Sequence, residues 1–188
     1  MTGLLITGLI IILALWGVAL YNSLVTLRQR NRQAFADIDV QLRQRHDLVP
    51  NLVETVKGYA RHERETMDAV IQARNAAVSA KGPTQQADAE NALSSALGRL
   101  FALAEAYPEL KANQNFLELQ QQLDDIENKL AAARRFFNSA AAEYNAKRES
   151  FPAAFIANYF GFTAQDFFDL GEDRRTQLET PPPVSFQP

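Results

Sequence analysis

The two histidines of the sequence are the side chains that come nearest to a catalytic or metal-binding pattern. His62 opens the run His62-Glu-Arg-Glu-Thr66, which begins like the zinc motif H-E-x-x-H but has Thr66 where the second ligand belongs. His46 stands between an arginine and an aspartate, in a triplet that is common on protein surfaces. No serine lies in a G-x-S-x-G elbow, and no glycine-rich phosphate-binding motif occurs. We therefore expect no catalytic residue, no metal site and no cofactor, and a protein that is not an enzyme.

The composition excludes further classes of site. The 188 residues include no cysteine, which excludes a disulfide framework, a thiolate metal site and a cysteine nucleophile. The formal net charge is −3, whereas a dedicated nucleic-acid-binding protein shows a basic excess. We therefore expect no nucleic-acid partner. Because 47% of the residues are apolar, the chain can bury a core of about one domain.

The distribution of charged residues along the sequence marks the N-terminal segment as a separate element. The first charged side chain is Arg28, so the opening 27 residues carry none. A helix from Gly3 to Leu27 is about 37 Å long, enough to cross a hydrocarbon core of about 30 Å with some tilt. The sequence predicts a transmembrane anchor at 1–27, whose apolar and aromatic side chains are Leu4, Leu5, Ile6, Leu9, Ile10, Ile11, Ile12, Leu13, Leu15, Trp16, Val18, Leu20 and Tyr21.

Two other interpretations of this segment are weaker. A cleaved signal peptide has small residues before its cleavage site, as in Gly17-Val18-Ala19, but it also has a basic n-region, which is missing here. A buried core helix is the other alternative, and an apolar run of this length is rare inside a small soluble domain. The anchor is the preferred interpretation.

The flanking charges predict an orientation. Arg28, Arg30 and Arg32 follow the apolar run before any carboxylate, and no Lys or Arg precedes it. By the positive-inside rule, the N-terminus lies outside and the large domain lies in the cytoplasm.

The region after the anchor has the composition of long helices. Alanine, leucine, glutamine, glutamate and arginine dominate it, and no stretch alternates apolar and polar residues over the length of a strand. Prolines and glycines divide it into four predicted helices, at about 22–47 (continuous with the anchor), 49–80, 84–106 and 109–149. If Pro50 bends the chain instead of turning it, the first two helices merge. We predict an all-α fold in which the transmembrane helix continues into an antiparallel four-helix up-and-down bundle.

The last predicted helix carries the clearest periodicity. Its apolar side chains recur in steps of three and four over four heptads, the spacing of a coiled-coil-like seam. The residues of this predicted bundle seam are Phe116, Leu119, Leu123, Ile126, Leu130, Phe137 and Tyr144.

An aromatic segment follows the helices. The predicted domains are the anchor at 1–27, the bundle at 28–150, an aromatic packing segment at 151–170 and an acidic, proline-rich flexible tail at 171–188. By parity, a fourth helix returns towards the anchor, so the aromatic segment starts near the bilayer. It could cap its own bundle, pack against another copy, or lie in the membrane interface. The side chains available for these contacts are Phe151, Phe155, Phe160, Phe162, Phe167 and Phe168.

Several blocks of the sequence resemble the LemA family. They are RQRHDLVPNLVETVKGYA (43–60), ALGRLFALAEAYPELK (96–111), NFLELQ (115–120), ARRFFN (133–138), Tyr144-Asn145, Phe151-Pro152, Phe160-Gly161-Phe162 and Pro183-Val-Ser-Phe186. The resemblance implies a bacterial membrane protein with one N-terminal span and a four-helix bundle. It implies no established enzymatic activity and no defined catalytic residues. Some relatives are implicated in forming internal membranes.

These observations together predict a non-enzymatic helical scaffold that self-associates at the bacterial inner membrane and helps to organise or shape it. Its expected partners are membrane lipid and further copies of itself, since confinement in two dimensions raises the effective concentration of copies. The alternative is a monomeric adaptor or sensor, tethered to the membrane, that binds a different protein.

Overall fold

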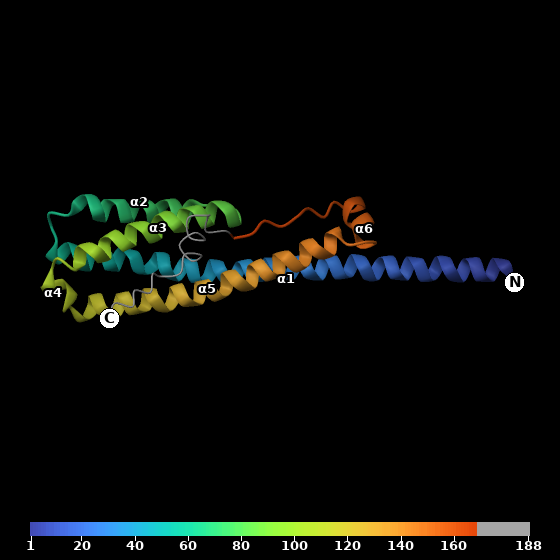
Figure 1. The fold of residues 1–188 in the computed structure, drawn as a ribbon, viewed down its shortest axis with the longest axis horizontal. Helices are drawn as coiled ribbons and strands as arrows, with labels where there is room; N and C mark the ends of the chain where they lie inside the picture. Colours follow the sequence, from blue (N-terminus) through green and yellow to red (C-terminus); the bar gives the residue numbers. More distant parts are fainter. Residues whose placement is uncertain (169–188) are drawn as a thin grey trace, which may run out of the picture. The chain divides into compact units, whose positions relative to one another are not determined.

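The computed structural model describes residues 1–168, which form helices and no β-strand (Figure 1). This confirms the predicted all-α fold, and the long N-terminal helix packs against another long helix. The predicted tail at 171–188 and the last two residues of the segment 151–170 lie outside the described residues. The helices are α1 (Thr2–Tyr59), α2 (Arg64–Ser79), α3 (Gly82–Ala104), α4 (Pro108–Lys111), α5 (Gln114–Glu149) and α6 (Ala153–Tyr159).

The first helix, α1, joins the charge-free segment to the charged part of the chain without interruption. It is the one helix among residues 1–168 that is long and apolar enough to cross a membrane. Its most apolar 18-residue window has a mean hydropathy of 2.5, and none of that window is buried in the protein. The first part of α1 is therefore a bare apolar rod, as a membrane-spanning helix requires.

The prediction that a helix begins at Pro50 is wrong, because α1 runs through this proline. The alternative, in which two predicted helices merge, is correct. A proline inside a helix removes one backbone hydrogen bond and costs about 3 kcal/mol. The side chains of Val49, Leu52 and Val53 around it are buried. Burial of each contributes about 1.5–3 kcal/mol, which outweighs the cost of the proline.

The breaks between helices also differ from the prediction. The predicted helix 49–80 is interrupted at residues 60–63, two positions after Gly58. The predicted helix 109–149 is divided into α4 and α5, because Asn113 starts a new helix. Its side-chain Oδ1 accepts a hydrogen bond of 3.0 Å from the backbone N–H of Phe116, which is the geometry of an N-cap.

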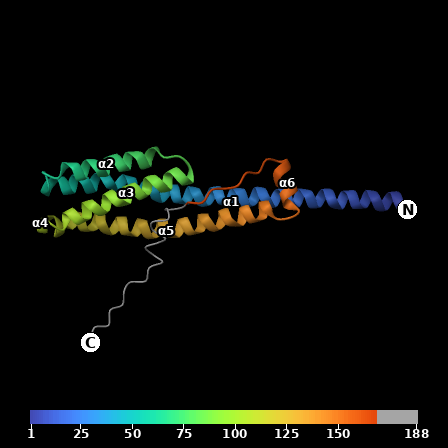
Figure 2. The ribbon, with the colours of Figure 1, turned by 45° about the horizontal axis from the view of Figure 1, so that its top comes forward.

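The chain forms two compact units. The first contains residues 1–48 and 120–167. In it α1 and α5 run antiparallel, since contacts that advance along α1 retreat along α5: Arg30 pairs with Glu143, Phe35 with Phe137 and Arg45 with Glu127. Figures 1 and 2 show these two helices side by side, with α6 beside α1 at the end of α5.

The second unit contains residues 49–119 together with Phe168. In it α2 and α3 pack against each other across a short connection. Two polar contacts tie the end of α1 and the residue before α2 to the residues that flank α4. The Tyr107 hydroxyl lies 3.4 Å from a Glu63 carboxylate oxygen, and Asn113 donates a hydrogen bond of 2.9 Å to the Tyr59 hydroxyl.

The predicted seam residues occupy both units. In the first unit Leu123, Ile126, Leu130, Phe137 and Tyr144 are buried, and in the second Phe116 is buried while Leu119 is half-buried. The ring of Phe137 contacts Phe35 of α1 at a centroid distance of 5.5 Å.

Candidate functional site

The structure does not gather the two histidines into a site. His46 is buried within α1 and has polar or electrostatic interactions of its own, whereas His62 is exposed in the turn before α2. Residues 1–168 hold no group of three or more His, Cys, Asp or Glu side chains placed to bind a metal ion.

The most elaborate contacts of the first unit lie where the bare part of α1 ends. Leu24 of α1, Tyr144 of α5, Ala157 of α6 and Phe162 form a small core in which no side chain is more than 4% exposed. We call this core the junction. Its partly buried rim consists of Tyr21, Val25, Leu27 and Ile156. The C-terminal end of α5 thus returns to the charge-free segment, as the parity of the helices predicted.

Aromatic and cationic contacts reinforce the junction. The ring of Tyr21 meets the edges of Phe160 and Phe162 at centroid distances of 4.9 and 5.6 Å. The guanidinium carbon of Arg28 lies 4.8 Å from the centroid of the Phe162 ring, within cation–π range. The first charged side chain after the apolar run is thereby held against an aromatic ring.

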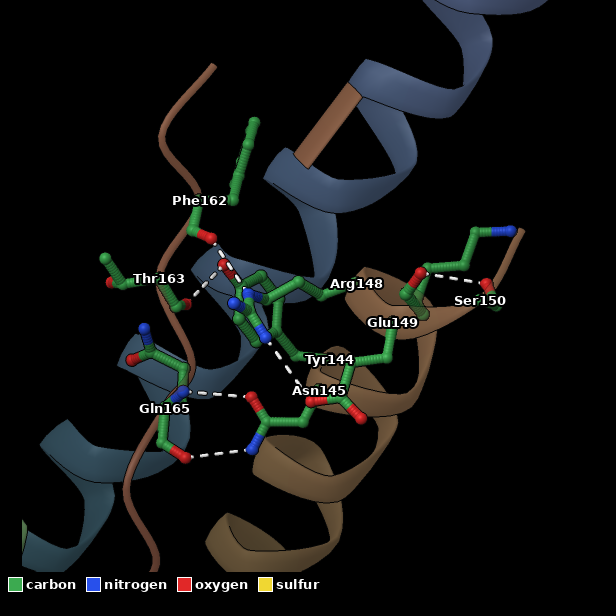
Figure 3. Close-up of polar contacts among 9 residues, drawn as sticks. Tyr144, Asn145, Arg148, Glu149, Ser150, Phe162, Thr163 and Gln165 are labelled. Atoms are coloured by element: carbon green, nitrogen blue, oxygen red, sulfur yellow. Dashed lines mark hydrogen bonds and ion pairs between the residues drawn. The ribbon is translucent and has the colours of Figure 1, made fainter. Parts of the chain in front are cut away.

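The chain after α6 is extended and crosses the end of α5; we call residues 162–167 the strap. Figure 3 shows three polar side chains from the last turns of α5, Tyr144, Asn145 and Arg148, reaching it. The Tyr144 hydroxyl donates to the Thr163 carbonyl, and Arg148 Nε donates to the Phe162 carbonyl, each at 2.9 Å. Asn145 exchanges two bonds of 2.9 Å with the backbone of Gln165. Side chains of α5 therefore satisfy the backbone hydrogen bonds of the strap, although the strap belongs to no helix or sheet.

The turn between α6 and the strap is a Schellman motif. The Phe162 N–H donates to the Ala157 carbonyl at 2.9 Å, and the Gly161 N–H donates to the Asn158 carbonyl at 3.4 Å. Gly161 occupies the left-handed position of the motif, with φ at +69°. This geometry turns the chain back so that Phe162 enters the junction.

We expect Gly161→Ala to destabilise this turn by about 1–2 kcal/mol, because a left-handed φ is unfavourable for a residue with a Cβ. A Cβ at this position would meet no atom within 4 Å, so the loss comes from the backbone alone. Amide hydrogen exchange at Phe162 and Gln165 measures it. Gly98→Ala is the matched control: it also has open space around the added Cβ but lies inside α3, where alanine is the better helix former. Equal effects of the two changes would contradict the assignment.

The hydroxyl of Tyr144 is held neutral in the folded chain. Burial raises its pKa above the ordinary 10.0, while Arg28 and Arg148 oppose this by lowering it. Since the folded-state pKa is the higher one, the unfolded chain loses this proton first as the pH rises. The stabilisation is complete below pH 10.0 and is lost as the pH rises through the folded-state pKa.

We therefore expect strap binding to weaken above pH 10.0, and Tyr144→Phe to remove this pH dependence. The mobility of a spin label at Asp166→Cys, followed during urea titration on both sides of that pH, is the measurement. Tyr107→Phe is the control, because its pKa is also raised but it lies in the other unit. A pH response of the strap that persists in Tyr144→Phe would contradict the prediction.

The aromatic segment has two kinds of side chain. Phe162 and Phe168 are buried, the former in the junction and the latter in the second unit. The others are exposed: Phe151 by 82%, Phe155 by 70%, Tyr159 by 84%, Phe160 by 57% and Phe167 by 48%. The aromatic segment therefore contributes two side chains to the protein core and exposes the others on the surface.

An ion network of two buried arginines and one partly exposed carboxylate lies farther along the α1–α5 pair. Glu127 is bridged by Arg134 at 3.0 Å and by Arg45 at 3.5 Å, and both arginine side chains are almost fully buried. A network of this kind fixes the register of two helices. Sequence periodicity did not reveal it.

Comparison with known proteins shows similarity over most of the chain. The sequence profile of the LemA family matches residues 34–186. Magnetosome protein MamQ of Magnetospirillum gryphiswaldense is 25% identical over 187 aligned residues, covering 86% of this chain and 69% of that protein. Magnetosome protein MamQ 2 of Paramagnetospirillum magneticum is 24% identical with the same coverage. Protein LemA of Metamycoplasma hominis is 22% identical over 160 residues, covering 85% of this chain and 73% of that protein.

Proposed function

The chain belongs to the LemA family, and from this premise we propose that it is a membrane-anchored, non-enzymatic helical scaffold that self-associates at the bacterial inner membrane. The observation that carries the proposal is the continuity of α1, which passes from an exposed apolar rod into the packed α1–α5 pair with no linker. A domain that only has to be kept near the membrane can be attached to its span by a flexible linker. A continuous helix instead fixes the angle between the bilayer and the helices packed on it, which is what a scaffold requires.

The orientation follows from the arginines beside the span. Arg28, Arg30 and Arg32 lie within one turn or two of its end, and the α5 residues Lys147 and Arg148 belong to the same end of the first unit. These cations favour the cytoplasmic side, with the N-terminus outside.

Self-association is supported by exposure and by confinement. The apolar side chains of the span leave a large exposed apolar surface on the single chain. Copies held in one bilayer meet at a much higher effective concentration than copies in solution. Two relatives are named as magnetosome proteins, and the proposal likewise makes this chain part of a cellular assembly.

The test is the mass of particles released from membranes by a lipid-retaining polymer, across a range of expression levels. We expect particles with two or more copies at all but the lowest level. Single copies at every level would overturn self-association while leaving membrane anchorage intact. A chain absent from the membrane fraction would overturn the anchor itself.

One observation favours the alternative, an adaptor that binds a different protein. An open groove of about 650 Å³ lies between the end of α1 and the start of α2 in the second unit. Its lining combines apolar side chains, three basic ones and two carboxylates: Val53, Met67, Ile71, Lys57, Arg61, Arg64, Glu54 and Asp68.

A single-cysteine photo-crosslinker distinguishes the two functions. Gly58→Cys places it in the groove, where an added Cβ meets no atom within 4 Å, and Gly98→Cys is an equally open control in α3. A ladder of self-crosslinks in native membranes supports the scaffold. A dominant foreign protein, captured from Gly58→Cys and not from Gly98→Cys, supports the adaptor.

A further inference from the structure

The short helix α6 lies at the level where the bare part of α1 ends. A Cβ on Gly17 of α1 would be 3.7 Å from the Cδ1 atom of Ile156, and Tyr21 packs its ring against Phe160. Apolar side chains of α1 before Gly17 are exposed, Leu15 by 65%, whereas Leu24 is fully buried. Protein cover therefore begins at α6.

This level agrees with the thickness of a bilayer. From Gly3 to Tyr21 the helix rises about 27 Å, at about 1.5 Å per residue, which is close to a hydrocarbon core of about 30 Å. A span that starts at the first residues of α1 therefore leaves the hydrocarbon where α6 touches it. The headgroup region is the environment available to the surface of α6.

The two faces of α6 have opposite character. Ala153 and Ala157 are buried against the rest of the first unit. Phe155 and Tyr159, four residues apart on the opposite face, are exposed by 70% and 84%, and the equally exposed ring of Phe151 meets the edge of Phe155 at 5.9 Å. We call Phe151, Phe155 and Tyr159 the aromatic stripe. Phe160 extends it, with its ring 5.0 Å from that of Tyr159.

The segment that contains α6 lacks charged side chains, as the span does. Residues 151–165 contain no Asp, Glu, Lys or Arg, so a second charge-free stretch lies beside the end of the first. Charges reappear immediately on either side, at Lys147, Arg148 and Glu149 before it and at Asp166 after it. A short uncharged segment with outward rings is the composition of an interfacial membrane element.

We propose that α6 is a second membrane contact, in which the aromatic stripe is inserted among the lipid headgroups and upper acyl chains of the cytoplasmic leaflet. This inference rests on the membrane anchorage in the proposed function and not on self-association. The occupant of the stripe is phospholipid, because the stripe adjoins the lipid-facing surface of α1 and continues it sideways. Through the junction, the stripe holds the end of α5 at the bilayer and resists tilting of α1.

The natural absence of cysteine allows a direct test by site-directed spin labelling. The full chain is reconstituted at one copy per particle in vesicles of phosphatidylethanolamine and phosphatidylglycerol. Labels are placed singly at Tyr159→Cys and Phe155→Cys, with Ile10→Cys as the mid-span control and the exposed Asp124→Cys of α5 as the aqueous control. The measured quantity is collision with oxygen, which is enriched in lipid, relative to collision with a water-soluble nickel chelate.

We expect the oxygen-to-nickel ratio at Tyr159→Cys and Phe155→Cys to be severalfold above that at Asp124→Cys and below that at Ile10→Cys. If the stripe labels match the aqueous control while Ile10→Cys reports lipid, the inference about α6 is overturned and the anchor stands. If Ile10→Cys also reports water, the anchorage has failed. Labels shielded from both reagents would assign the stripe to protein contacts and would likewise overturn the inference.

Discussion

Replacement of Phe162 by alanine is expected to free α6 and the strap from the α1–α5 pair. The Phe162 side chain is 4% exposed and fills the junction between Leu24, Tyr144 and Ala157. Removal of a buried phenylalanine ring costs about 3–5 kcal/mol, and this one also carries the contacts with Tyr21 and Arg28. Because about 1.4 kcal/mol is a factor of ten, local opening should increase on the order of a hundredfold or more.

Hydrogen exchange at the backbone amides of positions 162 and 165 measures this effect. In the folded chain these N–H groups donate to the Ala157 carbonyl and to the Asn145 side chain. Phe160→Ala is the matched control. Its ring also contacts Tyr21 but is 57% exposed, so its removal should cost roughly 1 kcal/mol. Exchange that is fast at these amides in the natural chain, or equal in the two variants, would show that the junction does not hold the strap.

The second large effect is expected from charges placed in the bare part of α1. Ile10→Arg together with Leu13→Arg puts two arginines near the middle of the segment, where neither side chain has cover from the protein. Each exchange of Ile or Leu for Arg at the centre of a span costs about 3–4 kcal/mol. We expect the doubly substituted chain to lose stable insertion and to leave the membrane fraction on alkaline extraction.

The matched control is Ile10→Ala with Leu13→Ala, which shortens the same side chains without introducing charge and should remain in the membrane. The two variants separate the cost of charge from the loss of apolar surface. Full retention of the arginine variant in extracted membranes would contradict the proposed anchor.

The sequence was most informative where one physical effect dominates. A run of 27 residues without charge predicts one long apolar helix, and the structure contains it. The absence of strands among residues 1–168 was equally predictable, since the sequence shows neither strand-like alternation nor hairpin-turn signals. The predicted helix boundary at Pro50 was wrong because burial of the neighbouring apolar side chains stabilises the helix by more than the proline destabilises it. The break at Asn113 was missed although its capping chemistry is visible in the sequence.

The junction could not have been assembled from periodicity. Tyr144 and Asn145 belong to a helix, while their partners Thr163 and Gln165 belong to an extended strap that has no repeating pattern. Side-chain bonds to the backbone of such a segment depend on a long-range return of the chain. The family blocks marked both Tyr144-Asn145 and Phe160-Gly161-Phe162 as notable, but only the fold shows that they meet.

The composition of the junction also sets an order of events during synthesis. Leu24 is made early and Phe162 late, so at about 5–20 residues per second the core stays incomplete for on the order of ten seconds. During that interval the apolar span is already available for insertion, while Leu24 lacks its cover. A chain that stops before Phe162 never acquires it. Closure of the junction thus requires synthesis as far as Phe162, and a chain that ends before this residue carries an exposed apolar surface that proteases and chaperones recognise.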